Sequence, residues 1–113
     1  MDVLFASEKW RKGANSQKKL VKRHGAERAK IIRRRLDDLA AAENLGVMRN
    51  LPGRCHEEKG DLKGILSLDL DGPYRLFFEP AHDPVPCMPH GGLDWSKVTA
   101  VRILRVEDPH GKN

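Results

Sequence analysis

The first third of the chain has the polar and apolar spacing of a short strand followed by helices. Val3 to Phe5 is an apolar run typical of a strand, and a polar stretch comes after it. A first helix is expected to begin after an N-cap at Asn15 or Ser16. It should run to about His24, because Gly25 stands at the position where helices commonly stop.

A second and longer helix is expected from Ala26 to about Ala42. Its apolar residues recur at three- and four-residue intervals, so one stripe of the helix should face a core. These residues are Ala29, Ile32, Leu36 and Leu39. The opposite face carries the charged residues Lys30, Arg33, Arg34 and Asp37. The pattern therefore predicts an amphipathic helix that packs on one side of the protein.

After a linker from Leu45 to Pro52, the pattern changes to the alternation of strands. Gly64 to Leu70 alternates between two faces, and Tyr74 to Glu79 reads as a second strand. The Asp71-Gly72-Pro73 segment between them is a turn signal. Together these segments predict a β-hairpin.

The length of the turn decides the register of this hairpin. A three-residue turn places Leu70 opposite Tyr74 and keeps the apolar partners on one face. A two-residue turn would instead place Leu68 opposite Arg75, so we expect the three-residue turn. It puts Arg75 on the other face, opposite Asp69, where the arginine can pair with that carboxylate or reach a ligand.

The last part of the chain is expected to be a long loop followed by a buried strand. Ala81 to Lys97 is rich in Pro and Gly, and we expect Trp95 to anchor this loop. Val98 to Val106 has apolar residues on both faces, which is typical of an interior strand. That strand should deliver Asp108 and His110 to its C-terminal end.

The charge of the chain points to a polyanionic partner. Its 113 residues include 21 Lys and Arg against 16 Asp and Glu, for a net charge of +5. Nucleic acid is the leading partner for such a surface, and plain solubility is the alternative. Basic residues crowd the two helices with Glu27 as the one acid among them, so we expect this surface to face a polyanion rather than to be only a solvated face, and Lys22 is an expected RNA contact. They are Lys18, Lys19, Lys22, Arg23, Arg28, Lys30, Arg33, Arg34 and Arg35.

Several classes of protein are disfavoured by the composition. No apolar run reaches the ~20 residues of a membrane helix, and the N-terminus lacks a secretory signal pattern, so we expect a cytoplasmic protein without membrane contact. Cys55 and Cys87 form no close pair, and nothing demands a disulfide. Cys87 and His90 have a ligand-like spacing, but Cys55 and His56 are adjacent, which is awkward for joint zinc ligation. We expect neither a metal nor another cofactor.

Titratable residues beside the expected strands supply the parts for RNA cleavage without a metal. Histidine transfers protons near neutral pH, and cationic side chains stabilise charge on phosphoryl oxygens. The alternative is structural: a histidine that only packs, an arginine in an ordinary cross-strand ion pair, and a frayed tail at the C-terminus. The catalytic hypothesis requires that His56, Arg75 and His110 line one cleft on the sheet. The residues that supply the parts are His56, Lys59, Arg75, Asp108 and His110.

Several stretches, taken in order, carry a family likeness across nearly the whole chain. They are the Val-Leu-Phe start, the Ala-rich second helix running into Asn44-Leu45, Leu51-Pro52-Gly53-Arg54, His56 with Lys59-Gly60-Asp61, the hairpin from Gly72 to Phe78, and Asp108-Pro109-His110-Gly111. In this order and spacing the chain resembles the HigB-like toxins of the RelE/ParE superfamily. Those proteins are the toxin half of bacterial type II toxin–antitoxin pairs.

The resemblance implies an α+β fold of RelE-like, microbial-RNase-like type, with N-terminal helices packed on a small, mostly antiparallel sheet in one domain, residues 1–113. It implies a metal-independent endoribonuclease that cuts mRNA on the ribosome and is silenced by a cognate helix-turn-helix antitoxin. The catalytic residues that follow from it are His56, Arg75, Asp108 and His110. The RNA-binding residues that we expect are Lys22, Arg54, Lys59 and Tyr74.

Pro109 departs from the family pattern, which has an aromatic residue between the terminal Asp and His. Proline offers neither an aromatic ring nor a hydroxyl, so either activity is weaker or Tyr74 or Trp95 stacks the base instead. Two alternatives to an enzyme therefore stay open. One is a non-catalytic binding protein, either a gyrase-directed ParE-like toxin or an inactive homologue that binds an antitoxin. The other is an RNA-binding module with an unrelated role.

Overall fold

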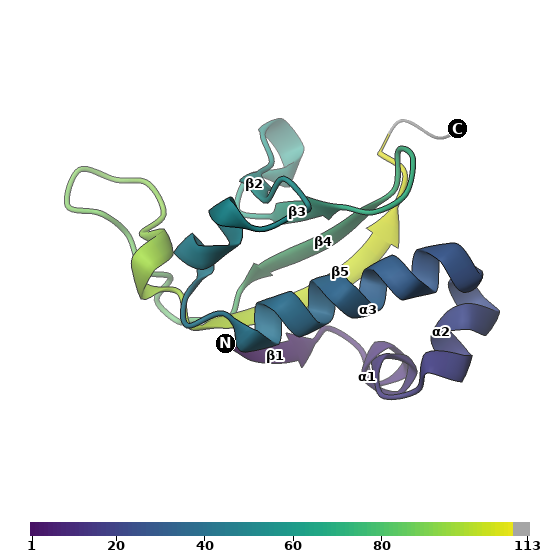
Figure 1. Cartoon of the computed structure of the whole chain (residues 1–113). Coiled ribbons are helices and arrows are strands. Elements are labelled where there is room, and N and C mark those ends of the chain that lie inside the picture. The colour runs from purple at the N-terminus through teal and green to yellow at the C-terminus, as the bar shows by residue number, and fades with distance from the viewer. Residues whose placement is uncertain (110–113) are drawn as a thin grey trace.

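The computed structural model describes residues 1–109 and shows a five-stranded sheet with a long helix lying across one face (Figure 1). The strand order is β1-β5-β4-β3-β2, with β1 parallel to β5 and every other pairing antiparallel. The expected α+β fold, with N-terminal helices packed on a mostly antiparallel sheet, is therefore confirmed. The strands are β1 (Asp2–Phe5), β2 (His56–Glu57), β3 (Leu66–Asp69), β4 (Arg75–Pro80) and β5 (Ala100–Glu107). The helices are α1 (Glu8–Ala14), α2 (Gln17–His24) and α3 (Ala26–Ala41), with 3-10 turns at Leu45–Asn50, Gly60–Leu62 and Trp95–Lys97.

The two helices expected from the sequence form where their end signals stand. Ser16 is the N-cap of α2, since its side chain accepts a hydrogen bond from the backbone N–H of Lys19. Gly25 ends α2 with a positive φ of 86°, a conformation that costs other residues energy. The apolar stripe of α3 is buried, as its spacing predicted, and packs in one core cluster with β3, β4 and β5.

Two expectations about connecting segments were wrong. The polar stretch after β1 is the helix α1, capped by Ser7 and buried only through Trp10, Gly13 and Ala14. This stripe is narrow and two of its three residues are small, so the hydrophobic period is hard to detect. The expected linker from Leu45 is a 3-10 turn that buries Leu45 and Met48 in the core.

The hairpin between β3 and β4 has the three-residue turn and the register that the sequence predicts. Asp69 pairs with Arg75, and the backbone N–H of Leu70 donates to the carbonyl of Tyr74 at 2.9 Å. Arg28 on α3 ties the turn to the helix layer. Its guanidinium donates to both oxygens of Asp71 at 2.8 and 3.1 Å and lies 3.5 Å from the centre of the Tyr74 ring. The pKa of the Asp71 carboxyl is lowered by this hydrogen bond from Arg28.

A β-bulge in the pairing of β4 with β5 changes which side chains share a face. Val101 and Ile103 are buried in the core, and continued alternation would place Arg105 there too. The register shifts between Phe77 and Phe78, so that Arg105 stands opposite Phe77. The bulge therefore brings charged residues of β5 to the polar face of the sheet.

The segment from Ala81 to Lys97 is a loop with Trp95 as its anchor, as predicted. Trp95 is 6% exposed, and its indole N–H donates to Glu57 at 3.0 Å. Arg49 lies 3.9 Å above the ring. β5 is an interior strand with β1 and β4 as its neighbours, also as predicted. Within residues 1–109, no helix is long and apolar enough to cross a membrane.

Candidate functional site

The sheet has one apolar face and one polar face. Along β4, Leu76 and Phe78 are buried in the core cluster with the helices, so Arg75, Phe77 and Glu79 point to the opposite side. Phe77 is fully buried on that side, with the Arg105 guanidinium 5.0 Å from its ring centre. The candidate site lies on this polar face, at the β2 and β3 end of the sheet.

A tight turn just before β2 positions His56. Gly53 has a φ of 113°, and its carbonyl accepts from the Asp69 N–H at 2.7 Å, which joins the turn to β3. Arg54 also has a positive φ, 48°, and its carbonyl lies 2.8 Å from Nδ1 of His56. This contact with the backbone carbonyl fixes the orientation of the imidazole. The other ring nitrogen, Nε2, then points at the Glu58 carboxylate.

Glu58 is the centre of the site. Its Oε2 atom accepts from the Ser67 hydroxyl at 2.6 Å and from Nη1 of Arg75 at 3.3 Å, and it lies 3.0 Å from Nε2 of His56. Ser67 is fully buried, and the Glu58 side chain is 12% exposed, so the contacts are largely screened from water. We call His56, Glu58, Ser67 and Arg75 the Glu58 cluster.

A second carboxylate beside the cluster holds two arginines. Asp69 accepts from Nε and Nη2 of Arg54 at 2.9 and 3.3 Å, and it lies 3.8 Å from Nε of Arg75. The hydrogen bond from Arg54 to Asp69 raises the pKa of that guanidinium. In this state each arginine of the site is paired with a carboxylate, so a phosphate would have to compete with Glu58 and Asp69.

The C-terminal end of β5 lies next to the cluster by register. Glu107 stands opposite Arg75 and pairs with Arg105 at 2.9 Å, and the half-buried Asp108 follows directly. Asp108 therefore comes one residue after the register partner of Arg75, and its role in the site stays a prediction. His110, the other catalytic residue expected there, lies outside the described residues.

Two of the expected RNA-binding residues lie elsewhere. Tyr74 packs against the core cluster on the helix side, one residue before Arg75 and therefore on the other face. Lys22 is on α2, an element at the far end of the molecule from β2 (Figure 1). Arg54 belongs to the site through Asp69, and the exposed Lys59 follows Glu58 in the chain. Trp95 is buried under Arg49 and presents no open face to a base.

Glu58 and Ser67 are the site residues that sequence reasoning missed. A two-residue period was the available signal: His56 and Glu58 fall on the same face of a strand, and Ser67 stands opposite His56 in the register. The two-residue length of β2 made that strand hard to detect. Among residues 1–109, no three His, Cys, Asp or Glu residues form a group that could hold a metal ion.

Comparisons with known proteins show a likeness in fold. No protein-family model matches the chain, and no curated protein sequence matches it. Among solved structures, the chain is similar to a YoeB/ParE toxin from Agrobacterium tumefaciens, with a TM-score of 0.59 and 11% sequence identity. The alignment covers 97% of this chain and 100% of that one. The chain therefore shares its overall fold with that toxin.

Proposed function

We propose that this chain is the toxin of a type II toxin–antitoxin pair and an endoribonuclease that works without a metal. Its substrate is mRNA on the ribosome, and residues 1–113 act as one cytoplasmic domain. The convergence of His56 and Arg75 on one oxygen of Glu58 carries the proposal. The similarity in fold to a YoeB/ParE toxin supports the toxin class.

The chemistry requires two proton transfers and one charge-stabilising cation. A base removes the proton from a ribose 2′-hydroxyl, the 2′-oxygen forms a bond to the adjacent phosphorus, and the bond to the 5′-oxygen breaks as an acid protonates that oxygen. Arg75 is suited to hold the phosphoryl oxygens through its planar set of donors. His56 supplies one proton transfer through Nε2, once bound RNA displaces that nitrogen from Glu58. Asp108 and His110 are proposed for the other.

The partners follow from the proposed class. A cognate antitoxin of the helix-turn-helix type would silence the toxin, and the ribosome would present the message. Arg54 and Lys59 are proposed to contact the RNA backbone beside the cluster.

The test is cleavage of cellular messages after induction, read by primer extension. We expect Arg75→Ala to abolish new 5′ ends and relieve growth arrest, with a loss of activity on the order of 10²–10³-fold. Arg102→Ala is the matched control, because Arg102 lies on the same face farther along the sheet and pairs with Glu79. Circular dichroism and urea unfolding would establish that both variants fold. Full toxicity of the folded Arg75 variant would overturn the assignment.

A second function is favoured by the pairing of Arg54 and Arg75 with carboxylates. In the free protein these arginines are already neutralised by Glu58 and Asp69, and Pro109 supplies no aromatic ring. Both facts fit a non-catalytic toxin that binds gyrase, or a homologue that only binds an antitoxin. DNA-damage signalling without new 5′ ends would indicate gyrase as the target. Absence of both signals would indicate the inert binder.

A further inference from the structure

The hairpin of α1 and α2 holds the whole excess of positive charge. Residues 8–24 contain seven Lys and Arg and one acid, Glu8. The rest of the chain contains 14 basic and 15 acidic residues, so it is close to neutral. A polyanion attracted by this protein would therefore be drawn to the hairpin first.

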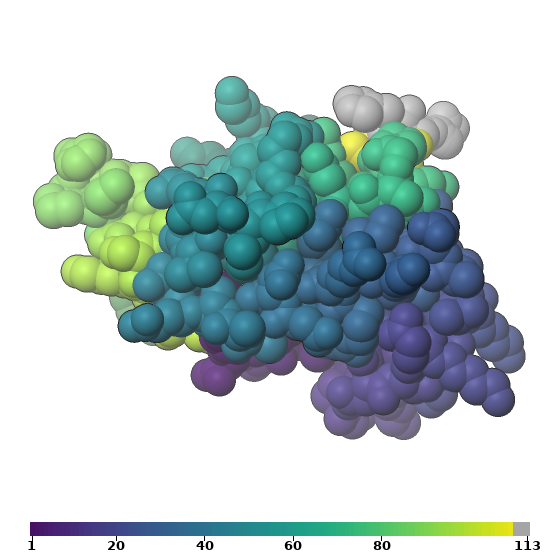
Figure 2. All heavy atoms as spheres, in the orientation of Figure 1, coloured from purple at the N-terminus to yellow at the C-terminus, as the bar shows by residue number. Residues whose placement is uncertain are grey.

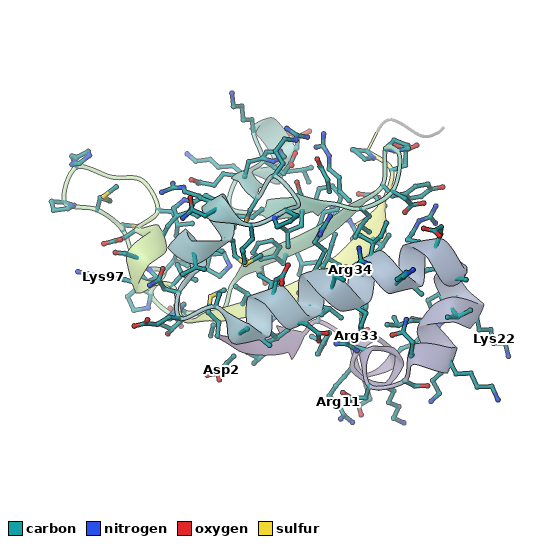
Figure 3. All side chains as sticks on the ribbon, viewed as in Figure 1. Asp2, Arg11, Lys22, Arg33, Arg34 and Lys97 are labelled. Carbon is teal, nitrogen blue, oxygen red and sulfur yellow. The ribbon has the colours of Figure 1, made fainter. Side chains whose placement is uncertain are left out.

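The hairpin forms a groove lined almost wholly by cations. It has a volume of about 480 Å³ and is lined by Lys9, Lys12, Gly13, Lys19, Lys22 and Arg23, which we call the cationic groove. Gly13 has no side chain to fill the groove, and a Cβ at this position would lie 3.8 Å from Nη1 of Arg23. The two helices lie together at one end of the molecule (Figure 2), and Lys22 extends from α2 into solvent (Figure 3). All five cationic side chains are exposed.

In the part of the chain that the structure describes, none of these five cations forms an ion pair with an acid. Among residues 1–109 the ion pairs engage seven other arginines and His56, and none includes a residue of the cationic groove. Glu8, the one acid of the hairpin, is paired with Arg11. The groove thus differs from the Glu58 cluster, where each arginine already has a carboxylate.

The side chains of the groove select a phosphate backbone rather than bases or a peptide. Binding of single strands depends on aromatic side chains that stack bases, and the one nearby indole is unavailable. Trp10 is 8% exposed and stacked between Phe5 and His24, at 6.0 and 5.9 Å. Binding of a protein partner usually depends on aromatic or aliphatic side chains that anchor the interface, and the residues that line the groove include no such side chain. A base-paired nucleic acid has the highest density of phosphates and needs no contact with bases.

We infer that the cationic groove binds the phosphate backbone of base-paired RNA, without regard to sequence. The choice of RNA rests on the proposed function. α1 packs beside β1, at one edge of the sheet, whereas the Glu58 cluster lies at the β2 and β3 edge. An RNA duplex in the cationic groove and a single strand at the Glu58 cluster therefore contact different parts of the protein. The bound duplex anchors the protein next to its substrate.

The experiment measures RNA affinity in the Arg75→Ala background, so that cleavage does not interfere. A labelled 16-base-pair RNA duplex is titrated by fluorescence anisotropy at several salt concentrations. The groove variant carries Gln at Lys9, Lys12, Lys19 and Lys22. The matched control carries Gln at four exposed cations outside the groove, namely Lys30, Arg34, Lys63 and Lys97.

We expect the groove variant to lose about tenfold or more in affinity and the control to lose far less. The slope of log affinity against log salt should become shallower by about 0.9 for each lost phosphate contact, the value for duplex DNA. Equal losses in the two variants, or no loss in the groove variant, would overturn the inference. Preference for duplex DNA or for a single strand would overturn base-paired RNA as the ligand. Message cleavage is measured in a separate assay on the protein that retains Arg75. Loss of the proposed function would therefore appear as absent cleavage, independently of the RNA affinity of the cationic groove.

Discussion

Glu58 and Arg75 meet on the polar face of the sheet, with Oε2 of Glu58 3.3 Å from Nη1 of Arg75. The same oxygen receives the Ser67 hydroxyl and faces His56. Glu58 therefore has two opposed effects in the proposed reaction. It holds the imidazole and the guanidinium in place, and it also occupies the donors that a phosphate would need.

Replacing Glu58 with Gln should separate these two effects. The amide keeps the shape of the side chain but loses the charge that holds Arg75, so RNA should bind more tightly, on the order of fivefold, or about 1 kcal/mol. His56 loses its orienting carboxylate, so kcat should fall. Steady-state kinetics would therefore show a lower KM together with a lower kcat. Glu79→Gln is the control, since Glu79 lies on the same face and pairs with Arg102 instead.

The substitution Gly53→Ala should destabilise the fold and displace His56. Gly53 has a φ of 113°, and an added Cβ would lie 2.9 Å from Nε of Arg35 and 3.0 Å from Cδ2 of Leu68. We expect a loss of about 2–3 kcal/mol in the free energy of unfolding, because backbone strain and a clash act together. Gly72→Ala is the control: its φ is 54° and nothing lies within 4 Å, so it should cost about 1 kcal/mol. Urea unfolding measures the loss in the free energy of unfolding for both variants. Equal losses for Gly53→Ala and Gly72→Ala would contradict the prediction, because they would mean that the neighbours of position 53 move away from the added Cβ.

The elements with strong local signals could be predicted from the sequence. α3 was predictable because its apolar stripe repeats from Ala29 to Leu39, and the β3–β4 register because only a three-residue turn keeps Leu68 opposite Leu76. α1 and the bulge in β5 could not be predicted in this way. α1 buries two small residues and one large one, and the bulge depends on how β4 and β5 meet across the sheet.

The candidate site was predictable only in part, for a related reason. His56 and Arg75 were selected as residue types suited to phosphoryl chemistry, and the structure brings them to one carboxylate oxygen. Glu58 could not be found in this way, because its place depends on the pairing of β2 with β3, and β2 is only two residues long. Tyr74 lies on the opposite face from Arg75, as alternation along a strand requires.

The stability of the α1–α2 hairpin should depend on pH through His24. Burial lowers the pKa of this imidazole, and the charges of Arg23 and Arg28 add to the effect. Nε2 of His24 is buried without a hydrogen-bond partner in the described chain, and the ring stacks on Trp10. As pH falls below 6.5, the unfolded chain takes up the proton first, so the free energy of unfolding should fall until the lower folded pKa is passed.

Replacing His24 with Phe isolates this effect from other titrating groups. The variant keeps a ring against Trp10 and removes the orphaned nitrogen. Urea unfolding between about pH 7 and pH 5 should show a flatter pH dependence for the variant than for the parent chain. Parallel curves would mean that another group is responsible.

The two cysteines should differ sharply in reactivity. Burial raises the pKa of the Cys55 thiol to about 12, whereas Cys87 is exposed in the loop before β5, with its thiol directed at the Val85 carbonyl. At pH 8 only about 10⁻⁴ of a thiol with that pKa is thiolate, the reactive form. A disulfide-exchange reagent should therefore modify one thiol per folded chain quickly and the second only after unfolding. Cys87→Ser should remove the fast phase and Cys55→Ser should leave it, and a fast phase that survives in the Cys87 variant would contradict the burial of Cys55.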